Sequence, residues 1–285
     1  MNTINSLIFF IFLSFLCFFH IEQKQTPDIL IEPDKIIVPE IQKPKKQSLS
    51  FVSVSEYRCL TPESVYCDVL NHSKQEPYGD KLGRYTNVHE TAHGIHNELR
   101  NEYKTLLKRP VNVFYCLNGK AIVLPEPNIK IRHISKYIPK ILRSSRYQLY
   151  LVDQTQYWDD VPLYILDEWN CYVLGGECAI DDLKKKVELE KTNAVSGCLE
   201  FSIYAVALAM AVKENDTIYW KSNDQFKGFI KYNLIRAERV FGAGSGVPEF
   251  YNKEQDRLYD ALLNHPDAKE LRDFLKSEFD GIFVD

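Results

Sequence analysis

The chain has 285 residues, of which 45% are apolar and 13% aromatic, and its 39 acidic and 35 basic side chains give a formal net charge of -4. This composition supplies enough apolar surface for a buried core, so it excludes a chain that is disordered throughout. The near balance of charge argues against a nucleic-acid-binding protein and against a channel for strongly anionic substrates.

The N-terminal region begins with an apolar run, "SLIFFIFLSFLCFF", at residues 6–19. It is typical of a targeting segment, but it lacks the basic start and the small residues that precede a signal-peptidase cut. Its length is close to the shortest that spans a bilayer. We therefore predict that residues 1–21 form either a signal peptide or an N-terminal membrane anchor. The protein is then exported, to an extracellular or periplasmic location, with or without a membrane tether.

The next segment, residues 22–48, is rich in proline and contains no glycine, with Pro27, Pro33, Pro39 and Pro44 at nearly regular spacing. Regular prolines favour extended backbone and a semi-rigid spacer. We predict a linker here, followed by one folded domain at residues 49–285.

Within that domain the hydrophobic pattern predicts mainly helices and a small sheet. A strand is expected at residues 49–55, and a hairpin at 111–124 around Asn118-Gly119. A helix from 84 to 108 ends before Pro110, and a second from 160 to 174 is expected to end at Gly175-Gly176. Residues 195–213 are apolar nearly all round and predict a buried core helix. Amphipathic helices are expected at 222–242, 253–265 and 267–279, and a flexible loop at 242–246. The predicted fold class is α+β, predominantly helical.

Six cysteines fall in the predicted domain: Cys59, Cys67, Cys116, Cys171, Cys178 and Cys198. An even number in an exported chain is compatible with disulfides, for which 15 pairings exist. Buried reduced thiols are the alternative. Because the chain has no CxxC pair, a zinc site built from cysteines is disfavoured.

The sequence "HETAH" at residues 89–93 is the main functional signal. On a helix, His89 and His93 differ by about 40° around the axis and by one turn along it, so both imidazoles point toward the same place. Glu90 can reach a water held there without displacing a ligand, as a general base must. His96 is within about 20° of the same face, two turns from His89.

This motif resembles the zinc-binding helix of the zincin metallopeptidases. The resemblance implies a zincin-like domain with one Zn²⁺ per chain, held by His89 and His93, and Glu90 as the catalytic carboxylate. The longer metzincin motif does not fit, since His96 and Leu99 stand at its later positions. In the gluzincin branch the third ligand is a downstream glutamate, which here implies Glu168.

The region around Glu168 offers support and alternatives. Tyr164, Glu168 and Tyr172 are one turn apart and form a polar stripe on the predicted helix, which favours a position facing a site. Other acids that could replace Glu168 are Asp167, Glu177 and Glu200, although a structural pairing is preferred for Glu200.

Further side chains near the motif are expected to support the site. We place His96 and Tyr172 either behind the ligands or on the substrate side. Arg100 could support the site, although an exposed helix surface is its more ordinary position. A donor to the developing oxyanion is expected from Tyr164, with Tyr157 and His96 as alternatives.

The implied activity is that of a zinc-dependent endopeptidase with a protein or peptide substrate and no nucleic acid partner. We expect the substrate to lie along the edge of the hairpin at residues 111–124, where main-chain hydrogen bonds can add a strand. Two alternatives remain at this stage. One is an exported, noncatalytic zinc-binding or interaction module, and the other is a metal hydrolase that cuts something other than peptides.

Overall fold

Helices make up most of the fold and are arranged along one long central helix, α6 (Tyr164–Lys185). The computed structural model describes residues 49–61, 64–76, 78 and 82–285. The predicted targeting segment at 1–21 and the linker at 22–48 lie outside the described residues.

The remaining helices and strands in the described part of the chain are α2 (Val65–Asn71), α3 (Arg84–Leu107), α4 (Ser145–Gln148), α5 (Thr155–Trp158), α7 (Ala194–Asn215), α8 (Thr217–Ser222), α9 (Asp224–Gly244), α10 (Lys253–Asn264), α11 (Lys269–Glu278), β1 (Val52–Ser53), β2 (Val111–Tyr115) and β3 (Lys120–Pro125). The predicted helix at 84–108, the hairpin and the three amphipathic helices are confirmed. The predicted strand at 49–55 is shorter than expected, since only β1 forms there.

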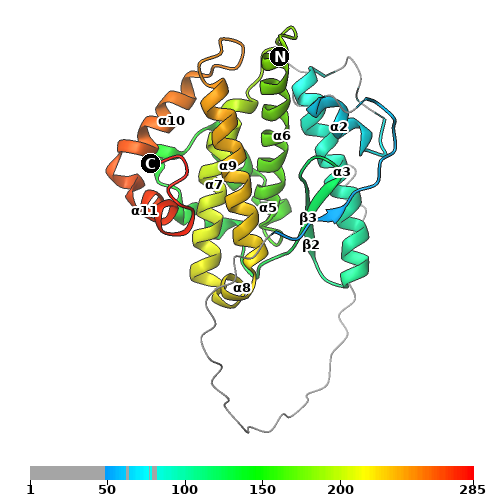
Figure 1. The fold of residues 1–285 in the computed structure, drawn as a ribbon. Helices are drawn as coiled ribbons and strands as arrows, with labels where there is room; N and C mark the ends of the chain where they lie inside the picture. The colour runs from blue at the N-terminus through cyan, green and yellow to red at the C-terminus, as the bar shows by residue number, and fades with distance from the viewer. Residues whose placement is uncertain (1–48, 62–63, 77, 79–81) are drawn as a thin grey trace, which may run out of the picture. The chain divides into compact units, whose positions relative to one another are not determined.

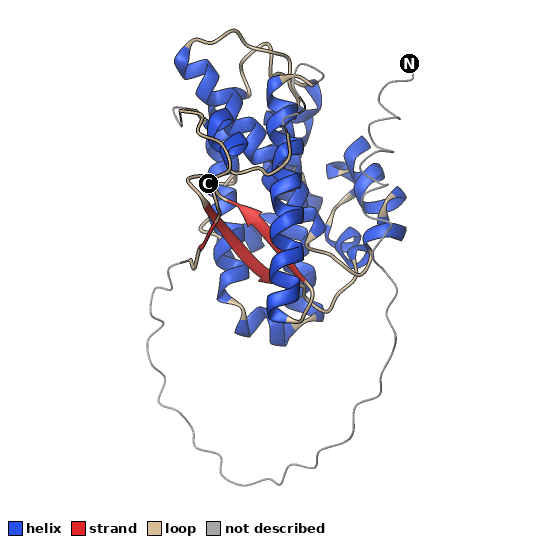
Figure 2. Ribbon diagram, turned by 90° about the vertical axis from the view of Figure 1, so that its right-hand side faces the viewer, coloured by secondary structure: helices blue, strands red, loops and turns tan. Residues whose placement is uncertain are grey.

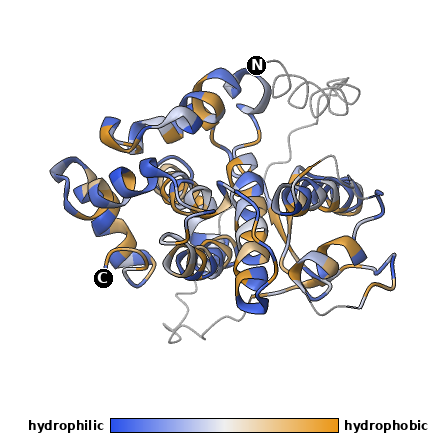
Figure 3. Ribbon diagram, turned by 90° about the horizontal axis from the view of Figure 1, so that it is seen from above, coloured by the Kyte–Doolittle hydropathy of each residue, from blue (hydrophilic) through white to orange (hydrophobic). Residues whose placement is uncertain are grey.

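Helix α6 lies between α3 on one side and α7 and α9 on the other (Figure 1). This position explains why α6 is buried along most of its length. Most helices carry both hydrophobic and hydrophilic residues, as the view from above shows (Figure 3).

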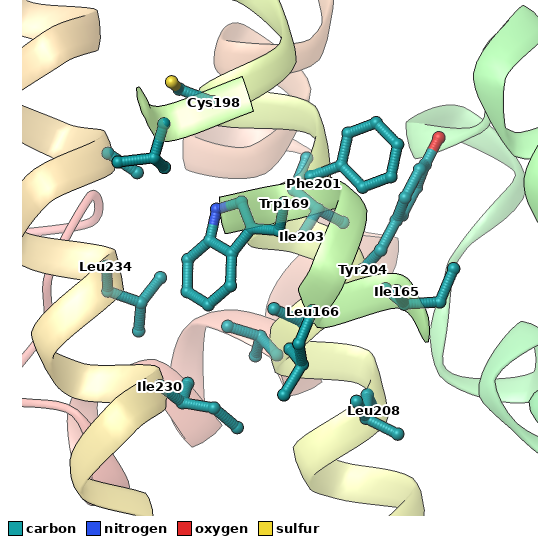
Figure 4. Close-up of a cluster of buried hydrophobic side chains, with 14 of the residues drawn as sticks. Ile165, Leu166, Trp169, Cys198, Phe201, Ile203, Tyr204, Leu208, Ile230 and Leu234 are labelled. Carbon is teal, nitrogen blue, oxygen red and sulfur yellow. The ribbon is translucent and has the colours of Figure 1, made fainter. Parts of the chain in front are cut away.

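The core between α6, α7 and α9 is filled by large apolar side chains around Trp169 (Figure 4). The Trp169 ring is fully buried, and its Nε1–H donates to Ser202 Oγ at 3.1 Å. Phe201 and Leu234 lie near it from α7 and α9. Burying an aromatic ring of this size stabilises the fold by a few kcal/mol, on the order of 3. This packing fixes the rotation of α6. Glu168, which precedes Trp169, therefore lies on a different face of the helix.

The sheet has the order β1-β3-β2 and is antiparallel throughout (Figure 2). Its hairpin turns through Leu117, Asn118 and Gly119, all with positive φ, and Asp68 accepts a hydrogen bond from the Asn118 backbone N–H. Edge strand β2 is buried along its whole length and packs against α3 and α6. The predicted addition of a substrate strand along this hairpin stays a prediction, with β2 as the edge strand of the sheet.

The glycine pair in α6 does not end the helix, in contrast to the prediction that it stops at residue 174. Both glycines lie inside α6 because neighbouring elements come too close for a side chain. A β-carbon at Gly175 would lie 3.0 Å from the carbonyl oxygen of Tyr85 on α3. One at Gly176 would lie 2.6 Å from Cγ1 of Val240 on α9. Continuation of α6 also places Glu177 on the helix, where it had been expected beyond the end.

Helix α7 is, among the described residues, the one helix long and apolar enough to cross a membrane, and 94% of its most apolar window is buried in the protein. It is the core helix that the sequence predicted. The start of the predicted loop at 242–246 is helical, since α9 continues to Gly244. All six cysteines of the described domain are free thiols, four of them buried, which corresponds to the reduced alternative.

Candidate metal centre

The HETAH motif at residues 89–93 lies on helix α3, at the border between the buried face of the helix and its more exposed face. The buried apolar residues of the helix recur every three or four positions and pack toward the sheet and α6: Tyr85, Val88, Ala92, Ile95 and Leu99. The helix begins after Gly83, where the Glu190 carboxylate accepts the Arg84 backbone N–H at 2.7 Å. A carboxylate at this end also interacts favourably with the helix dipole. His89 and His93 lie beside the buried face, with side chains 14% and 20% exposed.

Three potential ligand atoms converge between α3 and α6. Nε2 of His89 lies 3.1 Å from Nε2 of His93, and Oε2 of Glu168 lies 3.6 Å from each of them. Ligands about 2.0–2.2 Å from a tetrahedral zinc ion are separated by about 3.3–3.6 Å. The two 3.6 Å sides of this triangle fall within that range, and the 3.1 Å side between the imidazoles is slightly shorter. The structure thus brings together the three predicted ligands, and we call them the three-ligand site.

The two oxygens of Glu168 have different surroundings. Oε1 accepts a hydrogen bond of 2.7 Å from the Tyr164 hydroxyl, whereas Oε2 is buried without a hydrogen-bond partner in the described part of the chain. A buried carboxylate oxygen without a partner costs free energy, which a cation beside it removes. Burial opposes ionisation of Glu168, but His93 and His89 outweigh it and hold the pKa of this carboxyl below its usual range. Glu168 is therefore an ionised acceptor directed at the two imidazoles.

Asp167, the second-choice ligand, has a different place. Its side chain is buried, and its Oδ1 lies 2.8 Å from Nδ1 of His93 and 2.9 Å from Nδ1 of His96. Its Oδ2 accepts from Arg100 at 3.2 Å. A carboxylate that accepts the Nδ1 proton of a histidine leaves Nε2 free for a metal, a common arrangement behind metal ligands. Burial opposes ionisation of Asp167 as well, but His96 and His93 keep its pKa well below the usual value.

His96 is completely buried, with Nδ1 bound to Asp167 and Nε2 at 3.2 Å from the side-chain nitrogen of Asn170. It therefore lies behind the ligands, and its expected alternative role on the substrate side is wrong. The group His93, His96, Asp167 and Cys171 also brings four potential ligand atoms together. Its nitrogen-to-oxygen distances are those of hydrogen bonds, and the nearby Arg100 guanidinium disfavours a cation, so we assign it to ligand support.

Tyr172 supports the site from the other side. Its ring meets the His89 ring edge to face at 4.7 Å and stacks on Phe201 at 4.8 Å. Gly197 leaves room for this ring, since a β-carbon there would lie 2.2 Å from it. Tyr172 therefore fixes the orientation of the His89 imidazole by packing.

Glu200, an alternative ligand in the sequence analysis, is held by a structural pairing. Its carboxylate accepts from Arg146 at 2.7 Å and from the hydroxyls of Ser144 and Tyr204. Glu177, another alternative, pairs with Arg236 on α9 through two hydrogen bonds of 2.8 and 2.6 Å. Neither acid contributes an atom to the three-ligand site.

Glu90 lies on the partly exposed face of α3, next to His89. Within the described residues its carboxylate makes no hydrogen bond or ion pair. The segment before α3 passes close to this face, because a β-carbon at Gly94 would meet the Gln75 side chain at 3.2 Å. Burial raises the pKa of the half-exposed Tyr78, and the charge of Glu90 raises it further. Tyr78 therefore stands near the Glu90 carboxylate.

Tyr164, expected to stabilise an oxyanion, is hydrogen-bonded to Glu168, the predicted third ligand. Its hydroxyl donates to Glu168, and its ring stacks on Trp158 at 4.2 Å. The other alternative, Tyr157, is about half exposed on α5. The structure thus gives Tyr164 the position of a group that orients Glu168.

Part of the polar network around Asp167 is not among the residues that the sequence predicts. Asn170 belongs to it, and its place at the third position after Asp167, which returns to a neighbouring helix face, could have indicated this. Arg100 was expected to be surface, but its side chain is only 15% exposed and pairs with Asp167. The spacing of seven residues from His93 to Arg100 places both on one face and could have indicated this role.

No protein-family model matches the chain, and neither the curated proteins nor the solved structures include a match. The assignment of function therefore depends on the geometry of the site.

Proposed function

We propose that this protein is a zinc-dependent peptidase of gluzincin type, with a zincin-like arrangement of α3 and α6. The observation that carries the proposal is the convergence of His89 Nε2, His93 Nε2 and the buried Glu168 Oε2, which has no hydrogen-bond partner in the described residues, in a triangle close to zinc-ligand size. Three protein ligands leave one coordination position open, as in catalytic zinc sites, whereas structural sites have four protein ligands.

When bound, zinc supplies a Lewis acid that polarises a peptide carbonyl and lowers the pKa of a coordinated water. His89, His93 and Glu168 would hold the ion. Asp167 and Tyr164 keep His93 and Glu168 in place through hydrogen bonds of 2.8 and 2.7 Å. The binding groups are thus oriented before substrate arrives, which reduces the cost of reorganisation during the reaction.

Glu90 performs the proton transfers in this proposal. Its carboxylate takes a proton from the attacking water and returns it to the nitrogen of the leaving amine, so the peptide C–N bond breaks as the new C–O bond is completed. This role requires a carboxylate near the ligands that is not engaged elsewhere, and Glu90 has that position. A purely structural metal site gains nothing from such a carboxylate, which favours the peptidase over a noncatalytic zinc module.

The test compares Glu90→Gln with wild type in the full-length, zinc-loaded chain, using denatured casein and a quenched-fluorescence peptide mixture as probes. We expect Glu90→Gln to lower hydrolysis by roughly 10²–10⁴-fold, the usual contribution of a general base, without loss of bound zinc. Glu98→Gln is the matched control, since Glu98 lies two turns further along α3 and pairs with Lys74.

Equal hydrolysis by wild type and Glu90→Gln would contradict the proposed mechanism. A wild-type chain that binds one zinc ion but cleaves neither probe would favour a noncatalytic module or a different substrate bond. Loss of activity in Glu98→Gln as large as in Glu90→Gln would show that the effect is not specific to the site.

A further inference from the structure

A chain of hydrogen bonds continues from the metal ligands into the core, beyond the residues that touch a metal. It runs from His93 to Asp167, then to His96, Asn170 and Arg236, over distances of 2.8, 2.9, 3.2 and 3.1 Å. We call Asp167, His96, Asn170 and Arg236 the relay. It connects α3 through α6 to α9, and all four side chains are at least nine-tenths buried.

The direction of every hydrogen bond in the relay is determined by its two ends. At the outer end, Arg236 can only donate, so the Asn170 oxygen must face it. The Asn170 nitrogen then faces the Tyr115 carbonyl oxygen at 2.8 Å and Nε2 of His96. His96 must therefore accept at Nε2 and carry its proton on Nδ1, which is the nitrogen that faces Asp167.

At the inner end the same logic applies. Asp167 can only accept, so it takes a proton from His96 and one from Nδ1 of His93. This hydrogen bond uses only Nδ1 of His93, so Nε2, the atom that belongs to the three-ligand site, points away from Asp167 and toward that site. The hydrogen-bond directions that Arg236 imposes are thus the same as those that metal binding at His93 Nε2 requires. Every hydrogen bond of the relay pairs one donor with one acceptor.

Arg236 itself is held firmly enough to determine this orientation. Its side chain is 6% exposed, and its guanidinium donates twice to Glu177 and once to Asn233 in addition to Asn170. A buried arginine with these partners cannot rotate without losing several charge-assisted hydrogen bonds. The amide of Asn170 consequently has one favoured orientation.

We propose that Arg236 and Asn170 are positioning residues that direct the Nδ1–H of His96 at Asp167, and thereby hold Asp167 in the place from which it orients His93 for the metal. Without the Asn170 donor at Nε2, the His96 proton is no longer directed to Nδ1, and Asp167 loses the donor that holds it beside His93. This inference rests on the proposed metal site and extends it to residues on α9.

The decisive variant is Asn170→Asp, which keeps the size of the side chain and its contact with Arg236 but replaces the donor that faces His96 and the Tyr115 carbonyl oxygen by an acceptor. The hydrogen bond that directs the His96 proton toward Asp167 is then lost. We expect the dissociation constant for zinc, measured by competition with a chelator, to rise at least about tenfold, as for other residues that support metal ligands. The absorption spectrum of the Co²⁺-substituted protein is expected to shift, because the donor strength of His93 changes.

Arg236→Gln is expected to weaken zinc binding similarly, whereas Arg236→Lys, which can still donate to Asn170, retains most of the affinity. Arg84→Gln is the matched control. Arg84 also pairs with a buried acid on α6, Asp182, at 2.6 Å, but it lies outside the relay. Its removal should lower the thermal unfolding temperature without changing the affinity for zinc.

A folded Asn170→Asp protein with wild-type zinc affinity and an unchanged Co²⁺ spectrum would overturn the relay, as would an equal loss of affinity in Arg84→Gln. If Arg236→Gln does not fold, Asn170→Asp decides alone, because it keeps the Arg236–Glu177 pair. A wild-type chain that binds no zinc would overturn the metal site and the relay together. If the wild type binds zinc and both Asn170→Asp and Arg236→Gln bind it with the same affinity, the relay is overturned but the metal site is not.

Discussion

Replacing Glu168 with Gln is the most direct test of the three-ligand site. The substitution keeps the shape of the side chain and an oxygen that can accept from Tyr164, but it removes the negative charge directed at His89 and His93. Asp167 and its hydrogen bond to His93 are unaffected. Only two strong ligands then remain, so the variant should no longer bind zinc at concentrations that saturate the wild type.

The expected size of the effect follows from linkage between binding and folding. A ligand at 1,000 times its dissociation constant stabilises the folded state by about 4 kcal/mol. For domains of this size, each kcal/mol raises the unfolding temperature by about 2–4 °C, so zinc should raise that of the wild type by about 8–16 °C. In Glu168→Gln this increase should disappear.

The assay is thermal unfolding with and without added zinc, after removal of bound metal with a chelator. Glu200→Gln is the control, because Glu200 is an equally buried acid that pairs with Arg146 and contributes no atom to the site. It should lower stability in both conditions and retain the zinc-dependent increase. A wild-type protein unaffected by zinc, or a Glu168→Gln protein that keeps the full increase, would refute the reasoning.

Three further predictions concern packing, ionisation and ligand orientation. Gly176→Ala should destabilise the protein by about 1–3 kcal/mol in urea unfolding, because the new methyl group overlaps Val240 on α9. Gly242→Ala is the control: its β-carbon has open space around it, so the variant should be neutral or stabilising. A similar loss of stability in both variants would contradict the packing argument. Burial raises the pKa of Glu126 to about 7, above its unfolded value, so its effect on stability is absent below about pH 4.5 and becomes unfavourable as the pH rises to 7. The wild type should therefore lose up to about 3 kcal/mol relative to Glu126→Gln between pH 4.5 and 8, and parallel pH profiles of the two proteins would exclude this assignment. Tyr164→Phe removes the donor to Glu168 and should weaken zinc binding by about tenfold in chelator competition, whereas unchanged affinity would show that packing alone orients Glu168.

The sequence by itself determined the local parts of this protein. The i, i+4 spacing of His89 and His93 is a property of a single helix, so their convergence could be predicted without any knowledge of the fold. The same is true of the hairpin at Asn118-Gly119, whose turn depends on residues that tolerate positive φ. The apolar sequence of α7 likewise required burial wherever it packed.

Only the tertiary structure decided which acid completes the site and what supports it. Glu168 and Asp167 are adjacent, and the rotation of α6 determines which of them faces Nε2 of the histidines. That rotation follows from the burial of Trp169 against α7 and α9, and from Gly175 and Gly176, which allow α3 and α9 to approach closely. These contacts join residues far apart in the sequence.

The relay illustrates the same limit. Arg236 lies 66 positions after Asn170, and its contact depends on how α9 packs against α6. Helical periodicity describes which residues share a face of one helix, but it does not say which face meets which neighbour. The ligand pair on α3 was therefore accessible from sequence, whereas the network that orients it was determined by the packing of three helices.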